Sequence, residues 1–341
     1  MCAAMALVVG QRTVLSVVSQ PAPAGARRMR WIGAAAGILL FGVLLGTTDL
    51  RPVLAGCWQV GPAFLLIVAA PVVGLGLHTA GWWILLPPRV RLAPGRAFQA
   101  YVAAQTVDEI ALGVAGEPLK VLALPPDRRE PGLAALLADN LTQLLANALF
   151  LFGGAGVLLL ALPASPGLGR AATRAGLLLL TALAAVALAL LAFGRRRPKA
   201  RAGRLGRLGD RLRCALDRAL ADARRDPLRF AASAALHLLG KLWVVVELGI
   251  TLHALGLDVG LEALALSVGA SLGALAGTPI PAGLGALEAS YGLAASLVGM
   301  SLAAAGSVAL LRRARSLAWA ALGLVWARSI VDGAGPAAAA R

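Results

Sequence analysis

Long apolar runs separated by short polar segments make up most of the chain. Six runs are close to or above the roughly 20 residues with which a helix crosses about 30 Å of hydrocarbon. Few stretches alternate between apolar and polar residues, so the pattern favours helices over a β-barrel. The predicted fold is an all-α polytopic membrane protein, with transmembrane helices at about residues 31–48, 61–86, 133–162, 175–194, 230–256 and 302–331.

A shorter apolar segment, residues 97–124, lies between the second and third spans. Basic residues flank both of its ends, so it is expected to enter the membrane and return to the same side. Gly116 and Pro118, with Gly113 before them, supply the turn of such a re-entrant hairpin, whose irregular backbone is tolerated where protein covers it. A pair of amphipathic helices on the cytoplasmic surface is the alternative.

A similar segment, residues 261–300, lies between the fifth and sixth spans. Its two short arms flank a turn that includes Pro281, Gly283 and Gly285, and Glu288 follows the turn. Each half of the chain therefore has three spans and one hairpin. Because three is odd, the second half begins on the opposite side of the membrane, which predicts two inverted-topology repeats of the kind found in transporters. Two unrelated hairpins are the alternative.

Composition divides the chain into five parts. Residues 1–28 contain only a short apolar run and are predicted to be a disordered tail or a gene-model extension, with Met29 as the true start. The first membrane repeat is predicted at 29–165, the first span of the second repeat at 166–194, a basic loop at 195–229 and the rest of the second repeat at 230–334.

The charge distribution orients the spans. The 341 residues are 59% hydrophobic and carry a net charge of +16, which in a soluble protein would suggest nucleic acid. Here the basic residues lie between the apolar runs, so no nucleic-acid partner is expected. The loop 195–229 holds thirteen basic residues and four aspartates, a net charge of +9, and is predicted to be cytoplasmic together with both chain termini.

Leucines recur within this basic loop at spacings of three and four, which predicts an amphipathic helix. Such a helix either lies on the inner leaflet or serves as a solvated linker, and both interpretations stay open. The leucines are Leu205, Leu208, Leu212, Leu216 and Leu220.

Polar residues inside the predicted spans are candidates for function. In the third span Asp139, Gln143 and Asn147 recur every four residues, with Asn140 beside them, and form a polar stripe on an apolar helix. Such a stripe faces protein or water. For Gln143 and Asn147, hydrogen bonding between helices is the favoured role.

The sixth span contains three arginines, Arg312, Arg313 and Arg315. Cations at this depth need acidic partners or an anion in a water-filled cavity, and the planar guanidinium suits phosphate. In the alternative, the helix breaks here and the arginines mark its cytoplasmic edge.

Patterns of catalysis or metal binding are not recognised in the sequence. His78 and His237 are interpreted as hydrogen-bonded structural residues, because no His/Glu spacing resembles a metal site. The three cysteines are widely separated, and no nucleophile has a base beside it. We therefore expect no catalysis, no cofactor and no metal.

Short motifs in both halves resemble one membrane family. They are "AFQAYVAAQ" followed by "AGEPLK", "AALLADNL" at the head of the third span, "PAGLGALEA" and "VALLRRARSL". In this order they resemble the lysylphosphatidylglycerol synthase transmembrane-region family of flippase-like proteins, from about Met29 to Arg328. The sequence departs from the family's pattern at Ala111, Ala115 and Asn140. "GEPLK" and the lone membrane unit are most similar to the branch associated with hopanoid biosynthesis.

This resemblance implies a bacterial inner-membrane protein that binds or moves an anionic or isoprenoid-derived lipid, so membrane lipids are its expected partners. Family members that aminoacylate phosphatidylglycerol carry a soluble synthase domain after the membrane part, and because this chain ends at Arg341 no aminoacyl transfer is expected. A non-catalytic scaffold for lipid-biosynthesis enzymes, docked through the basic helix, is the alternative. The residues predicted to line the head-group cavity are Glu117, Lys120, Asp139, Asn140, Glu288, Arg312 and Arg313.

Overall fold

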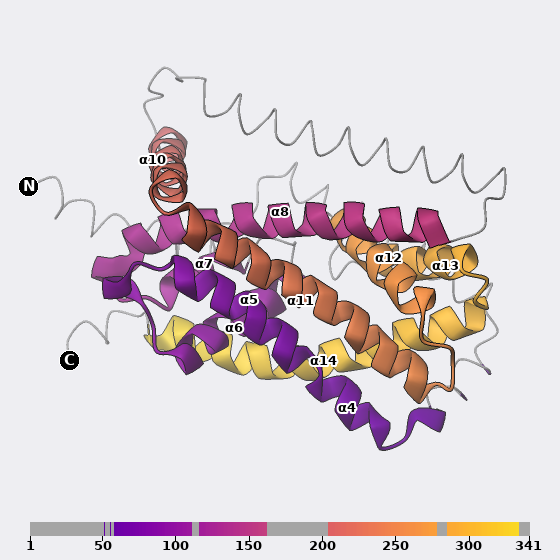
Figure 1. The fold of residues 1–341 in the computed structure, drawn as a ribbon. Coiled ribbons are helices and arrows are strands. Elements are labelled where there is room, and N and C mark those ends of the chain that lie inside the picture. Colours follow the sequence, from indigo (N-terminus) through magenta and orange to yellow (C-terminus); the bar gives the residue numbers. More distant parts are fainter. Residues whose placement is uncertain are drawn as a thin grey trace, which may run out of the picture.

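The computed structural model describes residues 51, 55, 58–110, 116–161, 204–277 and 285–333 (Figure 1). Every regular element in these ranges is helical, which confirms the predicted all-α membrane fold. The α-helices are α4 (Ala63–Ala69), α5 (Pro71–Leu85), α6 (Pro94–Ile110), α7 (Glu117–Leu122), α8 (Arg129–Ala161), α10 (Arg204–Arg225), α11 (Pro227–Ala254), α12 (Leu261–Gly277), α13 (Ala286–Leu297) and α14 (Leu302–Gly333). Two short 3₁₀ helices, η1 (Pro88–Val90) and η2 (Pro126–Arg128), precede α6 and α8.

Three segments are long and apolar enough to cross a membrane: Ala63–Leu85, Pro126–Ala161 and Pro227–Ala254. They match the second, third and fifth predicted spans. The second span is divided into α4 and α5 where Pro71 begins α5, since proline has no N–H to continue the helix. The first and fourth predicted spans, 31–48 and 175–194, and the tail 1–28 lie outside the described residues.

The sixth predicted span corresponds to α14, one continuous helix of 32 residues, which is not among the three segments apolar enough to cross a membrane. The alternative in which this helix breaks at the arginines is therefore wrong. Arg312, Arg313 and Arg315 lie within the helix and not at its end, so their charges must be stabilised inside the protein or by a bound ligand.

The two predicted hairpins lie at opposite ends of the molecule. In Figure 1, α6 and α7 lie at the same end as α10, whereas α12 and α13 lie at the other end. The first hairpin begins at Pro94, earlier than predicted, and its returning arm α7 has only six residues. The long helices α8 and α14 run between the two ends, so the element order and the placement of the hairpins fit two halves of opposite orientation.

The described turn residues close these hairpins in different ways. Gly116 precedes α7, and its N–H donates to Asp108 Oδ1 at 2.7 Å, which ties the turn to the end of α6. Pro118 lies in the first turn of α7, where a missing N–H costs nothing. Gly285 precedes α13 with φ +79°, a left-handed conformation that favours glycine. The other predicted turn residues, Gly113, Pro281 and Gly283, lie outside the described ranges.

Helices α5 and α11 form the central pair of the fold. Trp243 Nε1 on α11 donates to Ala70 O at 2.8 Å, at the start of α5. At the other end of the pair, Arg229 donates from Nε to Ile84 O and from Nη2 to Leu86 O. These are carbonyls at the C-terminal end of α5, which lack partners within the helix. Arg229, one of the thirteen basic residues of the loop, therefore caps a helix of the first half.

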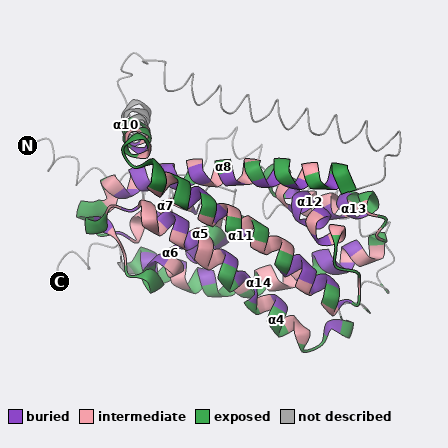
Figure 2. Ribbon diagram, viewed as in Figure 1, coloured by how far each residue is buried: buried purple, intermediate pink, exposed green. Residues whose placement is uncertain are grey.

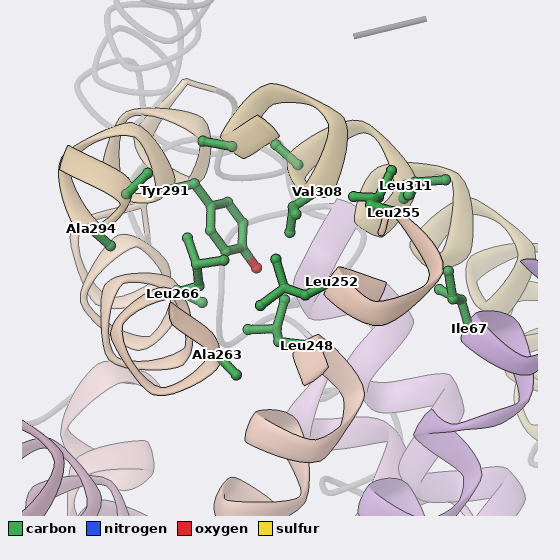
Figure 3. Packing of buried hydrophobic residues seen from close by; sticks show 14 of the residues in the cluster. Ile67, Leu248, Leu252, Leu255, Ala263, Leu266, Tyr291, Ala294, Val308 and Leu311 are labelled. Atoms are coloured by element: carbon green, nitrogen blue, oxygen red, sulfur yellow. The ribbon is translucent and has the colours of Figure 1, made fainter. Parts of the chain in front are cut away.

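The largest apolar core lies where the second hairpin packs against α11 and α14. Figure 3 shows the Tyr291 ring beside Leu266, with Leu248, Leu252 and Val308 around it. Outside the cores, many residues along the helices are exposed, as the green parts of α4, α8 and α14 show in Figure 2, and several of them are large and apolar. Examples of these exposed residues are Leu65, Leu160, Leu317 and Val325. Such exposure suits contact with hydrocarbon.

Helix α10 covers the segment in which the leucine spacing predicts an amphipathic helix. It packs against α8, with Ala215 and Ala219 buried and Arg218 Nη1 donating to Glu130 Oε1 at 2.7 Å. The Glu130 carboxylate raises the pKa of Arg218 above its ordinary value, because it stabilises the charged guanidinium. One face of α10 is therefore used inside the molecule.

Replacing Gly116 by alanine is expected to open the first hairpin. A Cβ at this position would lie 1.9 Å from Ala104 O on α6, so the turn must move away from α6. We expect a loss of about 1–3 kcal/mol in the free energy of unfolding, measured by thermal unfolding in detergent. Gly153→Ala on α8 is the matched control, because its Cβ would meet nothing within 4 Å. Equal unfolding temperatures for the two variants would contradict this packing.

Candidate functional site

A buried cluster of charges forms where α7 meets α8. One turn of α7 places Glu117 and Lys120 on the same face, and Lys120 Nζ lies 3.0 Å from Glu117 Oε1. The same ammonium lies 3.2 Å from Asp139 Oδ2 on α8 and 4.4 Å above the Tyr101 ring on α6. The Lys120 side chain is 2% exposed and that of Asp139 is 0% exposed. A cation and its acid are thus held away from water at the first hairpin.

Asp139 connects this lysine to two histidines on the central helix pair. Its Oδ1 lies 2.8 Å from His237 Nε2 on α11, and Gln143 Nε2 donates to its Oδ2 at 2.9 Å. His237 Nδ1 lies 2.9 Å from His78 Nδ1 on α5, and the two rings are stacked. We call Glu117, Lys120, Asp139, His237 and His78 the Lys120 chain. It is a continuous series of hydrogen bonds that joins the two halves of the protein.

Two glycines give the histidines their space. A Cβ on Gly81 of α5 would lie 2.7 Å from His237 Nε2, and a Cβ on Gly240 of α11 would lie 2.7 Å from His78 Nε2. His237 therefore lies over Gly81, which is three residues after His78. His78 in turn lies over Gly240, which is three residues after His237. The sequence motifs "HTAG" and "HLLG" thus occupy equivalent positions in α5 and α11. This reciprocal packing is what two-fold related halves would produce at their axis.

A second group of charges forms where α13 meets α14. Arg312 Nη1 donates to the Tyr291 hydroxyl at 2.7 Å, and Arg313 Nε donates to Glu288 Oε1 at 2.7 Å. Arg315 Nη1 donates to Glu247 on α11. We call these three arginines with Tyr291, Glu288 and Glu247 the arginine cluster. Its spacing is similar to that of the first half, because Glu288 and Tyr291 are three apart on α13 as Glu117 and Lys120 are on α7.

Glu288 has a second role at this position. Its Oε2 accepts from the N–H of Gly285 at 2.9 Å and so caps the start of α13, while its Oε1 accepts from Arg313. The glutamate therefore fixes the hairpin turn and neutralises one arginine at once. These contacts give Glu288 and Arg313 a structural function.

Two ionisable residues lie beside the arginine cluster and form no ion pair within the part of the chain that the structure describes. Half-buried Lys241 on α11 is within electrostatic range of Arg312 and of His78, and makes no hydrogen bond or ion pair with the described residues. Glu109 near the end of α6 is within electrostatic range of the arginines and hydrogen-bonds to Gln105 at 3.4 Å. Lys241 thus lies between the Lys120 chain and the arginine cluster.

The structure divides the predicted cavity residues into two groups. Glu117, Lys120 and Asp139 come together in the Lys120 chain, whereas Glu288, Arg312 and Arg313 belong to the arginine cluster. Asn140 is exposed on α8 and belongs to neither. Gln143 bonds to Asp139 of its own helix, so the predicted bond between helices is wrong for this residue.

Several residues in or beside these clusters were not singled out as site residues from the sequence. They are His78, His237, Tyr101, Tyr291, Glu247 and Lys241. The repeated spacing of His-x-x-Gly and of Glu-x-x-Tyr is a signal that marks three of them, His78, His237 and Tyr291, whereas no such motif marks the other three. Within the described ranges, no group of three or more His, Cys, Asp and Glu residues is arranged to hold a metal ion.

Comparison with known protein families identifies the family of this chain. The model of the family described as "Lysylphosphatidylglycerol synthase TM region" matches residues 30–323, which is most of the chain. No curated protein and no solved structure matches.

Proposed function

Because the chain belongs to the lysylphosphatidylglycerol synthase TM-region family, and is thus a membrane protein related to lipid handling, we propose that it transports a lipid by moving an anionic head group between the two leaflets. Residues of both halves would enclose the head group near the middle of the membrane. Rearrangement of one half against the other would then expose it alternately to each side.

The observation that carries this proposal is the state of Arg312. Its guanidinium is half-buried within α14 and donates to the neutral hydroxyl of Tyr291, whereas its neighbours Arg313 and Arg315 each form an ion pair with a glutamate. In the described part of the chain, Arg312 forms no ion pair. The carboxylates of Glu247 and Glu109 are within electrostatic range of Arg312 but form no ion pair with it. An arginine inside a membrane protein without a carboxylate in contact is costly unless an anion binds to it.

Lys241 supports the same interpretation. It brings a second cation within electrostatic range of Arg312, and neither has a carboxylate in contact among the described residues. Two cations that repel each other at this depth are stabilised by a shared anion. A phosphate fits, because the planar fork of arginine donates two hydrogen bonds to it while lysine acts as a point charge.

The proposal also includes the membrane in which the protein lies and the class of lipid that it moves. The segment from η1 to the start of α6, which contains Arg89, Arg91 and Arg96, and helix α10 lie at one end of the molecule, an arrangement that supports a cytoplasmic position for this end in a bacterial inner membrane. The cargo class is a lipid with a phosphate head group. The "GEPLK" motif adds isoprenoid-derived and hopanoid-related lipids to the cargoes worth testing.

Reconstitution of the full chain into phosphatidylcholine vesicles tests this function. A trace of phosphatidylglycerol with a fluorescent acyl chain is added, and dithionite quenches the label in the outer leaflet only. We expect the protein to bring inner-leaflet label within reach of dithionite in minutes, whereas protein-free vesicles keep about half of it protected. Protection that is the same with and without protein would overturn the proposal.

A further inference from the structure

The hydrogen bonds of the Lys120 chain determine where its protons lie. The Asp139 carboxylate can only accept, so His237 donates to it from Nε2. A neutral His237 ring then has no hydrogen on Nδ1, which must accept the Nδ1–H of His78. The Nε2 of His78, on a half-buried ring, is an acceptor that has no hydrogen-bond partner among the described residues. The Lys120 chain can therefore take up a proton at His78 Nε2.

An added proton need not stay at its point of entry. When a proton from water binds His78 Nε2, the proton on His78 Nδ1 can pass along the 2.9 Å bond to His237 Nδ1. The only bonds that change are these N–H bonds, and the positive charge moves to His237 beside Asp139. A second proton would make both Nδ1 atoms donors and break their hydrogen bond. The pair thus has capacity for one added proton.

The charges around the pair agree with this capacity. Lys120 is one cation hydrogen-bonded to two carboxylates, Glu117 and Asp139, so these three groups carry a net charge of −1 when the histidines are neutral. One proton on the pair brings the five residues of the Lys120 chain to neutrality, whereas Lys241, which is outside these five, adds a positive charge near His78. The groups that face His78 from neighbouring helices are Tyr101 of α6, Lys120 of α7, Asp139 of α8, and His237 and Lys241 of α11.

Lys241 links this proton site to the proposed head-group site. Its charge opposes a proton on His78, and it also lies within electrostatic range of Arg312. An anion bound between Lys241 and Arg312 would offset that opposition and favour protonation of the histidine pair. By linkage, a proton on the pair would strengthen anion binding by the same factor.

From these contacts we infer that the His78–His237 pair binds one proton for each anionic head group, so that the proton gradient across the membrane drives lipid movement. The inference rests on the proposed transport function and names its coupling ion. The pair lies at the contact between α5 and α11, one helix from each half. A rearrangement of the halves would therefore change the side from which His78 can be protonated.

A pH gradient across the reconstituted vesicles tests this coupling. Fluorescent phosphatidylglycerol is allowed to reach a steady distribution between leaflets at a gradient of one pH unit, with the voltage clamped by potassium and valinomycin. With one proton per head group, the wild-type distribution should shift by up to about tenfold, because one pH unit is a tenfold ratio of protons. A protonophore should remove the shift.

Glutamine variants of the three histidines separate the pair from a general effect of histidine. His78→Gln and His237→Gln should lose the gradient-dependent shift, because glutamine forms hydrogen bonds but does not titrate in this range. His253→Gln, near the end of α11 and outside the Lys120 chain, should keep it. A wild-type protein that exchanges lipid but shows no shift would overturn the coupling and leave the transport function standing. Absence of exchange would overturn both.

Proton uptake in detergent gives a readout that does not require transport. Addition of dihexanoyl phosphatidylglycerol to the full chain in weak buffer should draw up to one proton per protein from solution. The same addition to a folded His237→Gln variant should draw none. Equal uptake by the two proteins would contradict the assignment to this pair.

Discussion

Lys120→Met is expected to destabilise the protein by about 3–5 kcal/mol, because removal of one partner of a buried ion pair leaves an uncompensated charge. The Lys120 ammonium contacts both Glu117 and Asp139, and its side chain is 2% exposed. Without it, two carboxylates remain close together in the protein interior. The measurement is the free energy of unfolding in detergent, by denaturant titration or thermal unfolding.

The double variant Lys120→Met with Asp139→Asn provides the decisive comparison. It removes both buried charges, while Glu117, whose side chain is 20% exposed, can be solvated. We expect the double variant to be more stable than Lys120→Met alone, with an interaction energy of about 1–3 kcal/mol between the two changes. Arg218→Met is the control for loss of an exposed ion pair and should cost at most about 1 kcal/mol. Additive losses in the double variant would contradict a buried pair.

Arg312→Gln is expected to weaken binding of an anionic head group by about tenfold to a hundredfold. A hydrogen bond between charged groups contributes about 1.5–3 kcal/mol, and each 1.4 kcal/mol is a factor of ten in affinity. Calorimetric titration of the purified protein with dihexanoyl phosphatidylglycerol measures this change. Within the described residues Arg312 contacts Tyr291 through one hydrogen bond and through the face of its ring, and it forms no ion pair, so the fold should tolerate the variant.

Arg328→Gln is the matched control for this titration, because Arg328 lies exposed near the end of the same helix. Its affinity for the short-chain lipid should be close to that of the wild type. If Arg312→Gln also bound with wild-type affinity, the head group would not contact Arg312.

The sequence predicts the positions of the helices well, because apolar length and broken glycine–proline segments are local signals. The second, third and fifth spans and both hairpins are recognisable in this way. Pairing of polar side chains is not local, as the hydrogen bond between His78 and His237 shows, since these residues are 159 positions apart. The only sequence signal for this contact is the His-x-x-Gly motif that occurs in both helices. It becomes informative only when α5 and α11 are known to pack together.

The role of an individual charged residue also depends on its tertiary contacts, which the sequence does not reveal. From the sequence, Glu288 is a cavity residue and Arg229 a basic residue of a loop. In the structure Glu288 caps α13 and neutralises Arg313, and Arg229 caps α5. The alternative of a scaffold that docks partners through the basic helix is less supported. The face of α10 with Ala215, Ala219 and Arg218 contacts α8 and is not free to dock a partner.

The central claim is that this protein moves anionic lipid head groups, with Arg312 as a recognition residue. The most direct measurement is the ratio of phosphatidylglycerol to phosphatidylcholine exchange rates in vesicles, for the wild type and Arg312→Gln side by side. We predict a ratio well above one for the wild type and close to one for Arg312→Gln. A wild-type ratio of one, or the same preference in both proteins, would contradict the account.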